Sequence, residues 1–395
     1  MITNTGYYTV GNKAFTDKLV AVLEASQTKE EVEWYFNNHI YDKIDWTIEP
    51  ELSLDQYYKI RAQQIRDQYD YVIILCSGGG DSTNVVWSFL NNGIKVDEVV
   101  ASAPIGGLSQ WTDTAKDTSA GNTMSETMLA QLPLMHEIHS KYPDVKITIN
   151  DYFETLLDYQ TDDWIFRCGE WIHPSSAARY DLDKQLHIKL LAEQGKKIAI
   201  VYGIDKPVLY YDAGDSINIM MSDLAVNVQR PPFKDKYPNV ENVLFYFAPE
   251  LPEMQIKQAH VLAKWIHMPE NSFAKEKMLD LRLPIISLEQ ARTRHSFYER
   301  AIIPCIYPQT YKQVFQGHKP TRMFLGEHDD WFYKIHNNTR TFDLIVSDFR
   351  NFIKEIDPIY LNGPRTGFKV FKLQYKIGTI SDFNPVNGFQ SLALT

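Results

Sequence analysis

A continuous apolar run followed at once by three glycines most limits how this chain can fold. Residues 71–76 (Tyr-Val-Ile-Ile-Leu-Cys) have the length of one strand, and no charged residue interrupts them. Such a run is typical of a parallel strand that is buried on both faces of its sheet. Residues 77–82 (Ser-Gly-Gly-Gly-Asp-Ser), the glycine turn, come next, and a helix is expected from about residue 82 to residue 91. The sequence therefore predicts a strand–turn–helix unit of an α/β protein.

Strand and helix patterns continue to alternate after this unit. Further strands are expected at residues 96–103, 145–150, 198–202 and 243–247, with helices at 123–141 and 175–194. A β-hairpin is expected over residues 208–221, with Gly214 near its turn. This order predicts an open, mostly parallel sheet with helices on both faces.

Three regions are expected along the chain. Residues 1–68 are expected to be helical, because Thr28 and Ser53 each begin a capping-box pattern, in which a side chain three residues later reaches back. Residues 69–250 hold the alternating α/β pattern. Residues 251–395 are expected to begin as helix and to continue as short mixed elements.

Composition excludes several classes of protein. The net charge of −10 argues against a general nucleic-acid coat, which needs a basic face. The three cysteines, Cys76, Cys168 and Cys305, lie far apart, which argues against a zinc knuckle and fits a reducing compartment. Residues 1–4 show no secretory signal, and no apolar run approaches the ~18 residues of a membrane-spanning helix. We therefore expect a cytoplasmic protein without a membrane partner.

The glycine turn has the chemistry of a phosphate site. The first amides of a helix have no internal acceptor, the helix dipole adds positive charge there, and glycines let the backbone approach an anion. No lysine follows the glycines, so the turn is not a P-loop. Asp81 suits a Mg²⁺ ion between carboxylate and phosphate. The alternative is a glycine turn that only joins a strand to a helix.

The turn resembles the SGGxDS signature of the PP-loop, or N-type, ATP pyrophosphatase superfamily. The match comprises Ser77, Gly78, Gly79, Asp81 and Ser82, and the looser resemblance extends over residues 70–250. The resemblance implies the adenine nucleotide alpha hydrolase-like sheet and cleavage of ATP between the α- and β-phosphates. It further implies transfer of AMP to a substrate oxygen, followed by displacement of AMP by a nucleophile. ATP and Mg²⁺ are the implied cofactors.

Within this superfamily the chain is most similar to the asparagine synthetase-like ligases, but without a glutaminase domain. Residues 1–68 are too short for that domain, and Met1 is not the cysteine nucleophile that it would need. The implied partners are ATP and a small-molecule or nucleobase acceptor, with nitrogen from ammonia, an amine or a separate subunit. Three alternatives stay open: a sulfur-inserting enzyme, a nucleobase-modifying enzyme, and an ATP-binding regulator without catalysis.

The resemblance assigns roles to residues at several strand ends. The implied ATP-binding residues are Ser77, Gly78, Gly79, Gly80, Asp81, Ser82, Thr83, Ala101, Ser102, Ala103 and Gly203. Asp81, Asp205 and Lys206 are the implied catalytic residues, with Lys206 on phosphate and Asp205 on a metal or an amine. A solvated turn is the alternative for the last two.

A second stretch, residues 166–176, combines several reactive side chains before an expected helix. Arg167, Cys168 and Arg179 are candidates for contact with substrate or phosphate, and loop packing is the alternative. Cys76 is expected in the core. His260 and His267 could share a helix face, but without a third ligand they are expected to be ordinary core or surface residues.

Overall fold

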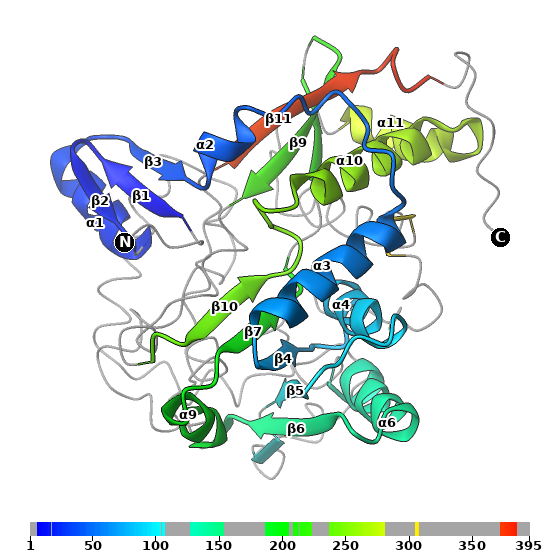
Figure 1. Cartoon of the computed structure of the whole chain (residues 1–395). Coiled ribbons are helices and arrows are strands. Elements are labelled where there is room, and N and C mark those ends of the chain that lie inside the picture. Colours follow the sequence, from blue (N-terminus) through cyan, green and yellow to red (C-terminus); the bar gives the residue numbers. More distant parts are fainter. Residues whose placement is uncertain are drawn as a thin grey trace, which may run out of the picture.

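A five-stranded parallel sheet forms the centre of the protein (Figure 1). The computed structural model describes residues 6–16, 18–103, 105–106, 127–153, 186–204, 208–212, 214–222, 237–280, 305–307 and 372–384. The strands are β4 (Tyr71–Leu75), β5 (Glu98–Ala103), β6 (Lys146–Asp151), β7 (Ile198–Tyr202) and β10 (Val240–Leu244). Their order is β10-β7-β4-β5-β6, and every neighbouring pair is parallel. The predicted parallel sheet is therefore confirmed.

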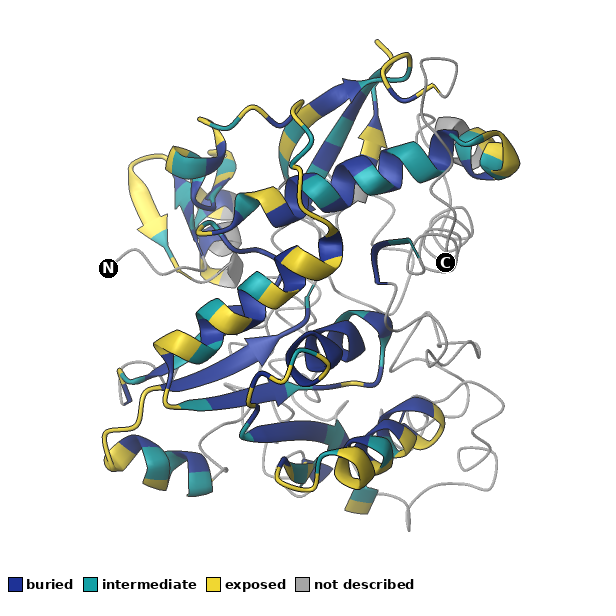
Figure 2. Ribbon diagram, turned by 45° about the vertical axis from the view of Figure 1, so that its right-hand side comes forward, coloured by how far each residue is buried: buried dark blue, intermediate teal, exposed yellow. Residues whose placement is uncertain are grey.

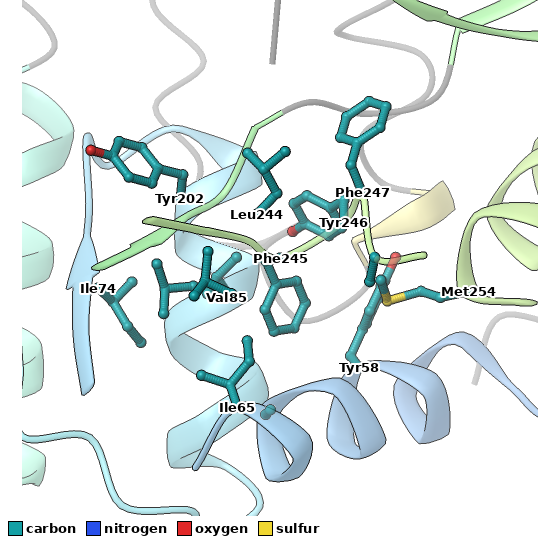
Figure 3. Close-up of a cluster of buried hydrophobic side chains, with 14 of the residues drawn as sticks. Tyr58, Ile65, Ile74, Val85, Tyr202, Leu244, Phe245, Tyr246, Phe247 and Met254 are labelled. Atoms are coloured by element: carbon teal, nitrogen blue, oxygen red, sulfur yellow. The ribbon is translucent and has the colours of Figure 1, made fainter. Parts of the chain in front are cut away.

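Helices cover both faces of this sheet, as its apolar strands require. On one face, Ile74 of β4 lies beside Val85 of α4 (Gly80–Leu90) in Figure 3. On the other, Glu98 of β5 accepts hydrogen bonds at 3.0 Å from His187 of α9 (Leu186–Glu193). Ile74 pairs with Val99, the neighbour of Glu98, and successive strand residues point to opposite faces. The sheet is therefore doubly covered.

The strand order reverses at β4. The chain proceeds from β4 outward to β5 and β6, and then returns to place β7 on the free side of β4, with Leu75 opposite Tyr202. In open α/β sheets, ligands bind beyond the carboxyl ends of the strands at this reversal. A ligand site is therefore expected at the residues that follow Leu75 and Tyr202.

Helix α3 (Leu54–Gln68) begins at the capping box predicted at Ser53. Ser53 Oγ accepts from the Gln56 amide at 3.3 Å, and Gln56 Oε1 accepts from the Ser53 amide at 2.9 Å. Figure 2 shows its alternation of buried and exposed residues, whereas α4 is buried along its length. Helix α3 thus packs over α4 with one face in solvent.

The helical prediction for residues 1–68 is wrong in its first half. Strands β1 (Tyr7–Val10), β2 (Lys13–Phe15) and β3 (Val32–Tyr35) form an antiparallel sheet beside α1 (Lys18–Thr28). Thr28 ends a helix instead of beginning one, because its hydroxyl donates to the Glu24 carbonyl at 3.1 Å and Lys29 turns left-handed at φ 62°. The β-branched and aromatic residues after it favour a strand.

The chain forms a second antiparallel sheet, of order β11-β9-β8. The hairpin predicted at residues 208–221 is confirmed as β8 (Val208–Tyr211) and β9 (Ser216–Ser222), and β11 (Lys372–Thr379) pairs with β9. The strand predicted at 243–247 is β10 instead, three residues earlier. The polar residues Glu241 and Asn242 interrupt the apolar pattern at its start. They are tolerated there because β10 is an edge strand.

The helix that begins just after the boundary predicted near residue 250 contacts residues of the first predicted region. Helix α10 (Pro252–His267) is followed by a 3-10 turn (Pro269–Asn271) and by α11 (Ser272–Asp280). Gln258 Nε2 donates to Tyr58 Oη of α3 at 3.0 Å, and Lys257 pairs with Glu49 at 2.9 Å. Among the described residues, no helix is both long and apolar enough to cross a membrane.

Asp97 makes the fold sensitive to acid. Its nearly buried carboxylate pairs with Arg66 at 2.5 Å and Lys95 at 2.7 Å, and it accepts from the Val72 amide at 2.8 Å. Burial alone would raise its pKa, but these three donors outweigh burial and lower the pKa below its ordinary value. The paired carboxylate therefore stabilises the folded chain above the unfolded pKa, and this contribution is lost as pH falls through the folded pKa.

We expect Asp97→Asn to lower the free energy of unfolding at pH 7 by about 2 kcal/mol, the scale of a hydrogen bond to a charged group. The difference from wild type should shrink from about pH 4 downward, where the wild-type carboxyl becomes protonated as well. Urea unfolding of both proteins from pH 7 to pH 3 measures this. A difference that stays constant with pH would contradict the assignment.

Candidate functional site

The glycine turn lies at the carboxyl end of β4, where the strand order reverses. Cys76 still hydrogen-bonds to the Val100 carbonyl at 2.8 Å, and the chain leaves the sheet at Ser77. Gly78 takes a left-handed conformation with φ 79°, Gly79 caps α4 from an extended conformation, and the helix begins at Gly80. The strand–turn–helix unit predicted from the sequence is thus present.

Two glycines are required here by close packing. A Cβ on Gly78 would lie 2.7 Å from the backbone nitrogen of Gln131, at the end of the π-helix η3 (Thr127–Gln131). A Cβ on Gly203, directly after β7, would lie 2.8 Å from Ser82 Cα. The glycine turn is therefore held between η3 on one side and the end of β7 on the other. The structure brings predicted site residue Gly203 against the turn.

The hydroxyl groups of the turn divide into internal and accessible ones. Ser82 Oγ donates to the Gly79 carbonyl at 3.2 Å and accepts from the Ser77 amide at 3.2 Å, so it holds the turn in shape. The hydroxyl of Thr83 is buried. Ser77 is exposed. The sequence predicted three hydroxyl donors for phosphate, and the geometry leaves Ser77 as the accessible one.

Backbone amides supply the remaining donors at the turn. The first bond within α4 runs from Thr83 N to Gly79 O at 3.0 Å, which leaves the earlier amides outside the helical pattern. In the described part of the chain, no acceptor meets the amides of Gly80 and Ser82. The helix dipole adds positive charge at the same place. These features together fit an anion.

Asp81 occupies the second helical position, where its carboxylate is half-buried. Within the described ranges, no three His, Cys, Asp or Glu side chains gather to hold a metal ion. A Mg²⁺ ion needs only one or two carboxylates when phosphate oxygens and water complete its shell. The residues present therefore fit Mg²⁺ bound together with a phosphate, and they do not form a site for the metal alone.

A buried tyrosine supports the start of α4 from behind. Tyr246 Oη donates to the Asp81 carbonyl at 2.8 Å and accepts from Asn84 Nδ2 at 3.0 Å. Figure 3 shows this ring in the core, close to Phe245 and Tyr58. Burial raises its pKa well above the ordinary value, so the hydroxyl stays protonated and remains a donor. No sequence pattern indicates this contact, since residue 246 was expected inside a strand.

Strand β5 is the neighbour of β4 in the sheet, and β6 lies beyond it. Ala101 and Ala103 are buried, and Ser102 Oγ accepts from Asn150 Nδ2 at 3.2 Å. Asp151 accepts from the Gly106 amide at 2.7 Å and thereby fixes the chain just after β5. Residues 101–103, which the resemblance assigns to ATP binding, are the last residues of β5.

The remaining candidate residues are either outside the described residues or buried in the core. Five predicted site residues lie outside the described residues: Arg167, Cys168, Arg179, Asp205 and Lys206. His260 bonds to the Trp46 carbonyl at 2.9 Å, and His267 bonds to the Ala263 carbonyl at 2.7 Å. Burial lowers the pKa of both, so they are core histidines, as expected.

Fold and site together define an α/β protein with a doubly covered parallel sheet and a glycine-rich turn at the reversal of strand order. No protein-family model matches the chain, and no curated protein or solved structure is significantly similar to it.

Proposed function

We propose that the chain binds ATP with Mg²⁺ at the glycine turn and transfers AMP to an oxygen of an acceptor. Pyrophosphate leaves, and a nitrogen nucleophile then displaces AMP to give an amide or amine. The observation that carries this proposal is the position of the turn. The amides of Gly80 and Ser82, which meet no acceptor among the described residues, lie with Asp81 and the exposed Ser77 at the reversal of strand order.

Each described residue has a defined task in this scheme. The amides of Gly80 and Ser82 hold phosphate oxygens and favour the charge that develops on the leaving pyrophosphate. The Ser77 hydroxyl donates to the same group, and Ser82 keeps the turn in the binding shape. Magnesium, held by Asp81 and phosphate oxygens, would neutralise part of the same charge. The acceptor would lie between the turn, the end of β5 and Gly203, which orients it toward the α-phosphate.

Nitrogen is preferred to sulfur as the nucleophile because of the described cysteines. A sulfur carrier needs an accessible thiolate. Cys76 is buried, and burial raises the pKa of the Cys305 thiol to about 12. Cys168 lies outside the described residues, so Cys168→Ala is the direct test of the sulfur alternative. Lost turnover in that variant would favour sulfur insertion.

We expect the wild-type protein to bind MgATP and, with its acceptor, to release AMP and pyrophosphate. Asp81→Asn should weaken magnesium-dependent ATP binding by about tenfold or more, the scale of one charge-assisted contact. Asp55→Asn is a matched control, because Asp55 has the same second position in α3. That control should lose only about 0.3–1 kcal/mol of stability through the helix dipole.

Calorimetric titration with MgATP, and with ATP in EDTA, measures the binding terms. Labelled ATP then reports the products. Formation of ADP alone, or equal ATP affinity in wild type and Asp81→Asn, would reject the proposed function.

A further inference from the structure

Gln131 contacts the two residues that flank Ser77, although Cys76 is 55 residues away in the sequence. Its side chain is buried, and Nε2 donates to the Cys76 carbonyl at 2.8 Å. Its backbone nitrogen and Cα are the atoms nearest to the face of Gly78, at 2.7 and 2.8 Å from an ideal Cβ. Both contacts lie one residue from Ser77, on either side of it.

A local distortion brings Gln131 to this place. Residues 127–131 form a π-helix that runs directly into α6 (Leu132–Lys141), and Pro133 is in the first turn of α6. Proline lacks an amide, and its ring crowds the carbonyl four residues earlier, here that of Leu129. A π-helix pairs residues five apart in place of four, so its turn is wider than that of an α-helix. Gln131 is the last residue of this π-helix, and its backbone lies against Gly78.

We propose that Gln131 is a positioning residue of the phosphate site. The hydrogen bond to Cys76 fixes the peptide before Ser77, and the backbone contact fixes the residue after it. Together they set the direction of the Ser77 hydroxyl and of the amides that follow. This inference rests on the proposed function, since it assigns Gln131 a task in binding the phosphates of ATP.

Gln131→Met is the direct test, because methionine has a similar length and no donor. Gln258→Met is its matched control: Gln258 is equally buried and donates one bond at 3.0 Å, but to Tyr58 in the helical layer. Loss of the bond in Gln131→Met should raise the dissociation constant of MgATP about tenfold. Adenosine, which has no phosphate, should bind with unchanged affinity. Gln258→Met should change neither.

A second variant, Gln131→Glu, tests the donor itself. A protonated glutamic acid donates to the Cys76 carbonyl, whereas the ionised form does not. MgATP affinity relative to wild type should therefore recover between pH 8 and pH 5 in Gln131→Glu and stay low in Gln131→Met. This profile is not expected from a purely structural role.

The outcomes separate the two proposals. Wild-type protein that binds no MgATP overturns the proposed function. Wild-type protein that binds MgATP, together with Gln131 variants that shift MgATP and adenosine equally or not at all, overturns the role of Gln131 alone.

Discussion

Replacement of Gly78 by alanine is expected to lower the free energy of unfolding by about 2–5 kcal/mol and to remove measurable MgATP binding. Two costs add at this residue. The left-handed φ of 79° is unfavourable for alanine, and the new methyl group would meet the backbone of Gln131 at 2.7 Å. Backbone atoms cannot move aside as a side-chain end can, so either η3 or the glycine turn must shift.

Gly195→Ala separates these two costs. Gly195 has nearly the same φ, 80°, but nothing lies within 4 Å of an ideal Cβ there. It should therefore show only the conformational cost, about 1–2 kcal/mol, and bind MgATP normally. Urea unfolding and calorimetric titration of the two variants measure both terms. Equal destabilisation of the pair would mean that the contact with Gln131 contributes nothing.

The parallel sheet was predictable because its signals are local. Apolar runs that end at turn residues gave β4 and β7 within a residue or so, and the hairpin at residues 208–221 had Gly214 near its turn. The N-terminal sheet was missed because Thr28 with Glu31 has the spacing of a helix start, and only the tertiary pairing of β1 with β3 decides otherwise. The pairing of β11 with β9 joins segments about 150 residues apart, and no periodicity reports it.

The same difference between local and long-range signals applies to the candidate site. The glycine turn carries its own signal, because three glycines between serines and an aspartate exceed what a simple turn needs. The side chains that support it do not. Gln131 and Tyr246 reach the turn from elsewhere in the chain, and each looks like an ordinary helix or strand residue in the sequence. The sequence can thus indicate a phosphate site, whereas the residues that fix its shape come from packing.

Arg61 connects helix α3 to the strand end that carries Tyr246. Its guanidinium is buried and donates to the Leu244 carbonyl at 2.8 Å and to the Phe245 carbonyl at 3.2 Å. A third group, the half-exposed Glu250 carboxylate, lies 2.5 Å away. The planar fork of arginine carries its donors on three separate nitrogens, and Nε, Nη1 and Nη2 each meet one of the three acceptors. Arg61 therefore holds the backbone just before Tyr246, whose hydroxyl supports Asp81.

Arg61→Met is expected to lower the free energy of unfolding by about 3 kcal/mol, since two buried carbonyls lose a charged donor. Arg61→Lys should recover less than half of this loss, because one ammonium group cannot meet all three acceptors. Lys59→Met, at an exposed position of the same helix, should stay within about 0.5 kcal/mol of wild type.

MgATP should bind more weakly to Arg61→Met at temperatures where the variant is still folded, because movement of residues 244–246 takes Tyr246 Oη away from Asp81. Urea unfolding and titration on the same samples test this. Full stability in Arg61→Met, or lost stability with unchanged MgATP affinity, would break the connection between α3 and the glycine turn.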